Sequence, residues 1–232
     1  MFSIRKITLS VLTAFVLVTF AGCASYTVDP SAKDVYLHSK ISPLESAVDA
    51  LIEGDALRAN EMANRELRNN PRDPRFNLIN ALAYQARAKG EGYLWNMAKV
   101  GYVLSHKFDP YLWQASYLSG LLELHERDLD TAAVSFAKAV AASPDVPGPF
   151  YGLAAASYAR GDFSLAYRAA GIALDIDDSV STEGLQIAAL CFAAAADFTR
   201  AERQLVKMQQ LGGGREWFED GPVSGSFLAT IP

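Results

Sequence analysis

The 232-residue sequence has little of what metal-binding, disulfide-stabilised or nucleic-acid-binding proteins need. It contains two cysteines, Cys23 and Cys191, which indicate no disulfide framework. Its formal net charge of −5 argues against nucleic acid as a partner, because that partner usually demands a basic patch. The three histidines, His38, His106 and His125, are isolated, and none has a second ligand at the spacing of a metal-binding helix. We therefore expect no metal site and no cofactor.

Signatures of catalysis are also missing. There is no Gly-x-Ser-x-Gly turn, and the Gly212–Gly214 run lacks the following Lys-Ser/Thr of a phosphate-binding loop. The acidic run at Asp175–Asp178 lacks the glycine and glutamate that a calcium loop needs, since Val180 and Gln186 stand in those places. The sequence therefore predicts a binding protein and not an enzyme.

Long apolar runs are limited to one, Ile7–Phe20, which follows Arg5 and Lys6. Its 14 uncharged residues are too few for an ordinary transmembrane helix and are typical of an export signal. The run ends in Phe20-Ala21-Gly22-Cys23, which resembles the lipobox of bacterial lipoproteins, although Phe20 stands where leucine is usual. The alternative is an ordinary secretory signal in which Cys23 is incidental.

The lipoprotein resemblance implies that residues 1–22 are a signal peptide and that Cys23 carries acyl chains. More than one chain would anchor the protein stably in a membrane. Because Ala24 and not aspartate follows the cysteine, the resemblance also implies delivery to the outer membrane of a Gram-negative bacterium, on its periplasmic side. We interpret residues 23–40 as the lipidated N-terminus and a tether, and residues 215–232 as a C-terminal tail.

Between these segments, residues 41–214 contain a repeat of about 34 residues. The segment 147–178 is its best example: an apolar helical pattern, a break at Gly161-Asp162, and a second helical pattern. A small residue recurs in each first helix, and an alanine recurs early in each second helix. The first set is Ala47, Ala81, Gly120, Ala154 and Ala189, and the second is Ala59, Ala98, Ala132, Ala166 and Ala201.

This period and order resemble the tetratricopeptide repeat (TPR) family. The resemblance implies an all-α fold, a right-handed superhelix of about five helix-turn-helix units. The early tryptophan of the family is absent, with Ser116, Phe150 and Leu185 in its place. The second unit has five extra residues near 88–93, which a turn between its helices can absorb.

In TPR proteins the first helices line a concave groove that binds ligands. The resemblance places an apolar, tyrosine-rich groove here, suited to an extended or helical peptide. The candidate residues are Leu78, Leu82, Tyr117, Leu121, Leu124, Tyr151, Tyr158 and Leu190, with Gln85, Ala155 and Gln186 beside them. The alternative is that some of them only pack one helix against another. Tyr93 and Trp95, near the enlarged loop, are possible secondary contacts that we expect to be accessible, or else core residues.

Anchor and repeats together resemble pilotin and tight-adherence (Flp/Tad) pilus lipoproteins. This implies an adaptor that binds secretin or pilus assembly components. Two alternatives remain open: a scaffold for cell-envelope polysaccharide or peptidoglycan biogenesis, and the N-terminal docking module of a larger secretion protein.

Overall fold

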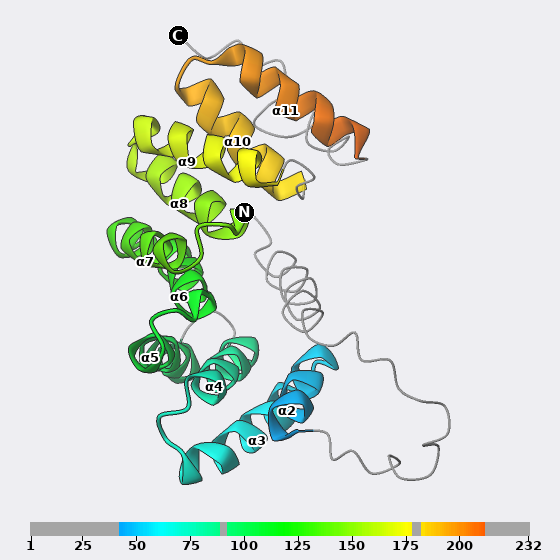
Figure 1. The fold of residues 1–232 in the computed structure, drawn as a ribbon, viewed down its shortest axis with the longest axis vertical. Coiled ribbons are helices and arrows are strands. Elements are labelled where there is room, and N and C mark those ends of the chain that lie inside the picture. Colours follow the sequence, from blue (N-terminus) through cyan, green and yellow to red (C-terminus); the bar gives the residue numbers. More distant parts are fainter. Residues whose placement is uncertain (1–41, 89–91, 178–181, 212–232) are drawn as a thin grey trace, which may run out of the picture. The chain divides into compact units, whose positions relative to one another are not determined.

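The computed structural model describes residues 42–88, 92–177 and 182–211, and all secondary structure within these ranges is helical (Figure 1). The helices are α2 (Pro43–Ile52), α3 (Ala56–Asn69), α4 (Pro74–Arg87), α5 (Tyr93–Phe108), α6 (Trp113–His125), α7 (Leu129–Ala142), α8 (Pro147–Arg160), α9 (Phe163–Ile176), α10 (Thr182–Ala194) and α11 (Phe198–Gln210). They form five consecutive pairs, which confirms the predicted all-α repeat. The predicted signal peptide, Cys23, tether and C-terminal tail lie outside the described residues.

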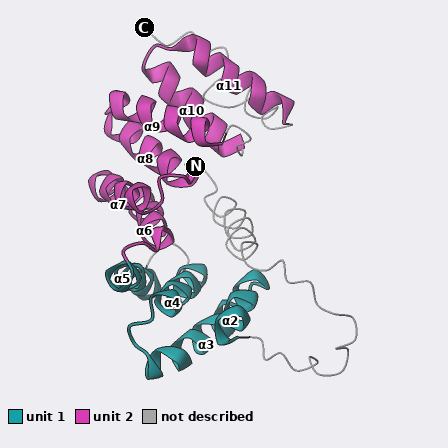
Figure 2. Ribbon diagram, viewed as in Figure 1, with its two compact units in different colours: residues 1–109 teal, residues 110–232 magenta. Residues whose placement is uncertain are grey.

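The chain divides into two compact units, residues 1–109 and 110–232 (Figure 2). Unit 1 contains α2–α5 and unit 2 contains α6–α11. Within each unit every helix packs on the next, and the first helices of successive pairs also touch: α2 with α4, α6 with α8, and α8 with α10. None of the helices in the described ranges is both long and apolar enough to cross a bilayer.

Four of the five pairs share one turn. A residue with positive φ ends the first helix, and the next residue, an aspartate, caps the second. The four dipeptides are Gly54-Asp55, Arg127-Asp128, Gly161-Asp162 and Ala196-Asp197. Each aspartate accepts a hydrogen bond from the backbone N–H three residues later, at 3.0–3.3 Å. The predicted break at Gly161-Asp162 is therefore confirmed, with Gly161 at φ 82°.

The α4–α5 pair departs from this pattern. The extra residues lie between the two helices, as predicted, and residues 89–91 among them are outside the described ranges. Helix α5 starts after Gly92, at φ 86°, without a side-chain cap. The start of α5 is consequently less well stabilised locally than those of the other second helices.

The repeated small residues form the contacts between helices. All ten of them are buried. Helices α4 and α5 approach so closely that a Cβ on Gly101 would lie 2.7 Å from the Ala81 Cβ. In unit 2, the fully buried Phe136 ring lies between Gly120 of α6 and Gly152 of α8. Small residues at these positions are therefore required by packing.

Candidate interaction surface

Most of the predicted groove residues are partly buried in the structure. Leu78, Leu82, Tyr117, Leu121, Leu124, Tyr158 and Leu190 all fall in this intermediate class. Tyr151 differs, because it is buried, with 6% of its surface exposed. Its hydroxyl has no hydrogen-bond partner among the described residues. Burial, together with the negative charge of Asp177, raises the pKa of Tyr151. The expectation that Tyr151 faces an open groove is therefore wrong: this side chain belongs to the core of α8–α10.

Three neighbouring groove candidates on α6 serve helix packing. Tyr117, Leu121 and Leu124 lie against the cluster that contains Phe136. The Tyr117 ring is 5.8 Å from the rings of both Trp113 and Phe136, and burial raises its pKa to about 12. The packing alternative left open by the sequence therefore describes the main contacts of these three residues.

The remaining candidates divide between packing and exposure. Leu82 packs on the core of α2–α4, and Tyr158 packs on the core of α8–α10 while its ring also contacts Phe163 at 5.8 Å. Leu78 and Leu190 keep part of their surface accessible. None of the eight predicted residues is among the exposed large apolar side chains of the described ranges. A role for the first helices in binding therefore stays a prediction.

The two secondary candidates, Tyr93 and Trp95, differ in their exposure. Tyr93 is 73% exposed, whereas Trp95 is buried, with 8% exposed. The expectation that Trp95 is accessible is wrong. Trp95 lies on the same face of α5 as the buried Ala98 and Tyr102, at spacings of three and seven residues, and this face packs on α4. Tyr93, two positions earlier, belongs to the opposite face.

That opposite face of α5 carries an exposed apolar stripe which sequence reasoning missed. Val100 is 52% exposed and Val103 is 60% exposed. With Tyr93, Asn96 and Lys107 they are spaced at i, i+3, i+7, i+10 and i+14, which places all five on one side of the helix. We call these five residues the α5 outer face. The signal was present in the sequence as a second apolar series, offset by two residues from the buried one.

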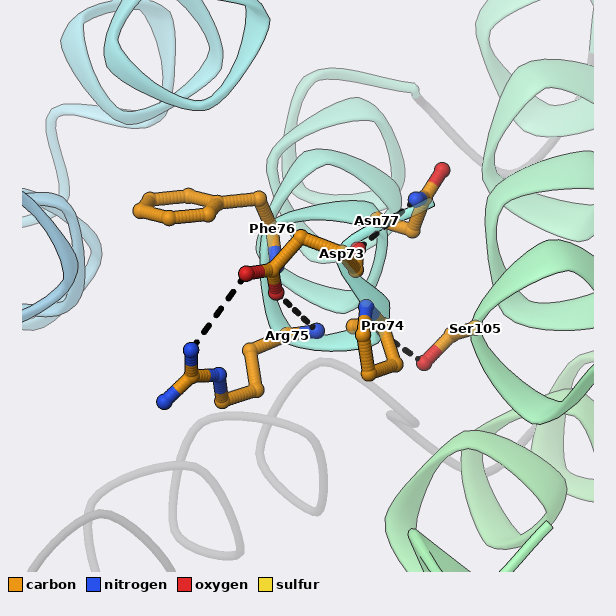
Figure 3. A network of polar contacts seen from close by, with 6 residues as sticks. All are labelled: Asp73, Pro74, Arg75, Phe76, Asn77 and Ser105. Atoms are coloured by element: carbon orange, nitrogen blue, oxygen red, sulfur yellow. Dashed lines mark hydrogen bonds and ion pairs between the residues drawn. The ribbon is translucent and has the colours of Figure 1, made fainter. Parts of the chain in front are cut away.

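Helix α5 is held firmly on α4. Ser105 donates a hydrogen bond of 2.8 Å to the Pro74 carbonyl at the start of α4, and Figure 3 shows its hydroxyl directed there. The buried Tyr102 hydroxyl donates to Gln85 Oε1 near the other end of α4, and burial raises the pKa of Tyr102. Both contacts lie on the inner face and hold the C-terminal half of α5 on α4, which leaves the outer face uncovered by α4.

The side chains of the α5 outer face suit association with another protein surface. Helix α5 has no aspartate or glutamate, and the outer face ends in the exposed Lys107. Apolar side chains at heptad spacing match the contacts of one helix on another. No group of three or more potential metal ligands occurs within the described ranges.

No protein-family model and no curated protein sequence matches this chain. Several solved structures do match this chain in fold. MamA from Desulfovibrio magneticus RS-1 (residues 41 to its end) has a TM-score of 0.60 and 19% identity, covering 73% of this chain and 93% of that one. The APC/C hetero-tetramer Cut9-Hcn1 has a TM-score of 0.59 and 11% identity, covering 73% and 32%. Naa15/Naa10 bound to HypK-THB has a TM-score of 0.54 and 15% identity, covering 72% and 24%. At these identities the similarity shows the fold alone, a TPR-like helical array.

Proposed function

We propose that this protein is a lipid-anchored periplasmic adaptor that binds protein partners and assists assembly of a pilus or secretion complex of the secretin type, without catalysis. The observation that carries the proposal is that every described helix belongs to one of five repeated pairs. Such pairs bury their apolar faces on one another and leave side surfaces for partners. The lipobox-like sequence at Cys23 supports the anchor.

The structure favours the α5 outer face as a contact surface over the first helices. Tyr93, Val100 and Val103 are each more than half exposed, whereas every predicted groove residue is partly or fully buried. Their heptad spacing fits a single amphipathic helix of the partner. Since α5 has no acidic residue, an acidic side chain on that helix would meet Lys107 without repulsion from α5.

The contact is tested with Val100→Glu/Val103→Glu, which places two charges at the centre of the face. Because both valines are exposed, the fold should tolerate the change. Co-purification of the envelope partner, identified by mass spectrometry after crosslinking in intact cells, should fall at least about tenfold. The matched control is Val134→Glu on α7, at a valine that is 55% exposed. Undiminished co-purification with the double variant would show that the α5 outer face is not the contact.

The identity of the co-purified partner decides the biological part of the proposal. A secretin-type ring subunit or a pilus component supports it. An enzyme of polysaccharide or peptidoglycan assembly would contradict it and support the envelope-biogenesis alternative.

The anchor is tested separately by detergent phase partitioning of wild type and Cys23→Ala. Loss of acyl chains removes about 0.8 kcal/mol of membrane affinity per buried CH₂ group. We expect the wild type in the detergent phase and the variant in the aqueous phase. Equal partitioning of the two proteins would rule out lipidation at Cys23.

A further inference from the structure

Unit 1 carries a concentration of arginines where α3 ends and α4 begins. Arg65 and Arg68 lie in the last two turns of α3, Arg72 lies in the connection, and Arg75 lies in the first turn of α4. All four are exposed. We call them the arginine corner. It is unexpected in a chain whose net charge is −5.

The acidic residues of this segment do not neutralise the corner. Asp73 accepts hydrogen bonds from the backbone N–H groups of Arg75 (2.9 Å) and Phe76 (3.3 Å), so its carboxylate caps α4 (Figure 3). Its side chain is 12% exposed, whereas that of its ion-pair partner Arg75, 3.3 Å away, is 61% exposed. Glu66, the other acidic residue between 65 and 75, is partly buried. The exposed surface of the corner is therefore basic.

Helix stability accounts for only part of this arrangement. A cation near the C-terminus of α3 is favoured by the helix dipole, which explains Arg68. The dipole does not explain Arg75, because the first turn of a helix disfavours positive charge. Within the described ranges Arg65, Arg68 and Arg72 form no ion pair. The side chains are thus available to an external anion.

We propose that the arginine corner docks on the phosphate groups of anionic phospholipids at the membrane surface. Guanidinium groups bind phosphate oxygens in pairs, and each basic residue near an anionic bilayer changes the binding constant about fivefold. The lipid anchor at Cys23, which belongs to the function proposed above, would hold the protein close to the bilayer. Residues 24–41 separate Cys23 from the first described residue, and 18 residues cannot span more than about 65 Å. The corner then provides a second membrane contact that orients unit 1.

The test uses the chain from residue 23 onward, with Cys23→Ser and no lipid, so that the corner is measured independently of the anchor. It contains all the described residues. Flotation compares vesicles of phosphatidylcholine alone with vesicles that also contain phosphatidylglycerol. We expect binding to the mixed vesicles only, and weaker binding as salt is raised. Arg65→Gln/Arg68→Gln/Arg72→Gln should lower this binding about 100-fold. Arg75 is left unchanged because it contacts Asp73.

The control variant is Lys138→Gln/Arg168→Gln/Arg203→Gln, which removes three exposed positive charges from unit 2. We expect it to bind mixed vesicles within about twofold of the parent chain. Val100→Glu/Val103→Glu should also bind normally, which separates the corner from partner capture. The proposal is overturned if the parent chain does not bind mixed vesicles, or if both triple variants lose binding equally. It is also overturned if the corner binds an anionic polymer such as heparin but no vesicle.

Discussion

Replacing Gly152 with alanine should destabilise unit 2, although alanine is the better helix former. Gly152 lies in the middle of α8, and an added Cβ would be 2.4 Å from both Cδ1 and Cε1 of Phe136. The ring cannot simply move away, because it also lies close to α6: a Cβ on Gly120 would be 2.9 Å from the same two atoms. Phe136 itself is fully buried. The added methyl group must therefore displace a helix.

The two opposing effects have known sizes. Alanine in place of glycine stabilises a helix interior by about 1 kcal/mol. Overpacking a buried site costs about 1–3 kcal/mol, and the backbones on both sides of the ring favour the upper end. The free energy of unfolding should therefore fall by about 2 kcal/mol, which corresponds to a melting temperature lower by roughly 4–8 °C.

Urea and thermal unfolding followed by circular dichroism measure the effect. Gly171→Ala in α9 is the matched control, since its Cβ would meet only an Arg200 guanidinium nitrogen at 3.9 Å. That substitution should stabilise the protein by up to about 1 kcal/mol. In a Phe136→Leu background, Gly152→Ala should cost at least about 1 kcal/mol less than in the wild type. If Gly152→Ala is neutral or stabilising, the close packing of α7 on α8 described above is incorrect.

Four further substitutions probe other parts of the fold. Ala196→Gly should stabilise unit 2 by about 0.5–1 kcal/mol in urea unfolding, because Ala196 has a φ of 61°. Gly161→Ala, at φ 82°, should destabilise unit 2 by about 1 kcal/mol for the same reason. Effects of the same sign would contradict the positive φ at these two turns. Tyr102→Phe removes the hydroxyl that donates to Gln85 and should lower the free energy of unfolding by about 1 kcal/mol. Amide hydrogen exchange in α5 should become faster. Unchanged exchange would show that this hydrogen bond does not hold α5 on α4. The pKa of Asp197 is lowered by hydrogen bonds from the Arg200 backbone and the Tyr167 hydroxyl, so its contribution to stability is present above the ordinary aspartate pKa and is lost as pH falls through the lowered value. The melting temperature of Asp197→Asn should therefore depend less on pH, between neutral and acidic solution, than that of the wild type. Parallel pH profiles for the two proteins would refute this.

The fold could be predicted because its rules are local and repeated. The helix break at Gly161-Asp162 follows from the left-handed conformation that glycine tolerates and from the capping carboxylate, and both are seen. The small residues at fixed spacing are buried throughout. The turns at Arg127 and Ala196 were less evident, since nothing in those residue types favours positive φ.

The candidate surface was harder to predict, because exposure depends on which helices pack against each residue. Tyr151 and Trp95 were expected to be accessible from their position in the repeat, but the structure buries both in helix contacts. Val100 and Val103 could not be distinguished from core residues by residue type. Only the packing of α5 on α4 through Tyr102 and Ser105 shows which side of the helix remains open.

The central claim is that the protein holds a partner through the α5 outer face, and site-specific photocrosslinking in living cells tests it most directly. A photoreactive residue at position 100 should crosslink to one envelope protein, a secretin-type or pilus component, while the same residue at position 134 should not. Crosslinking only from positions on the first helices, such as 78 or 190, would contradict the claim. It would indicate that the partner binds in the predicted groove instead.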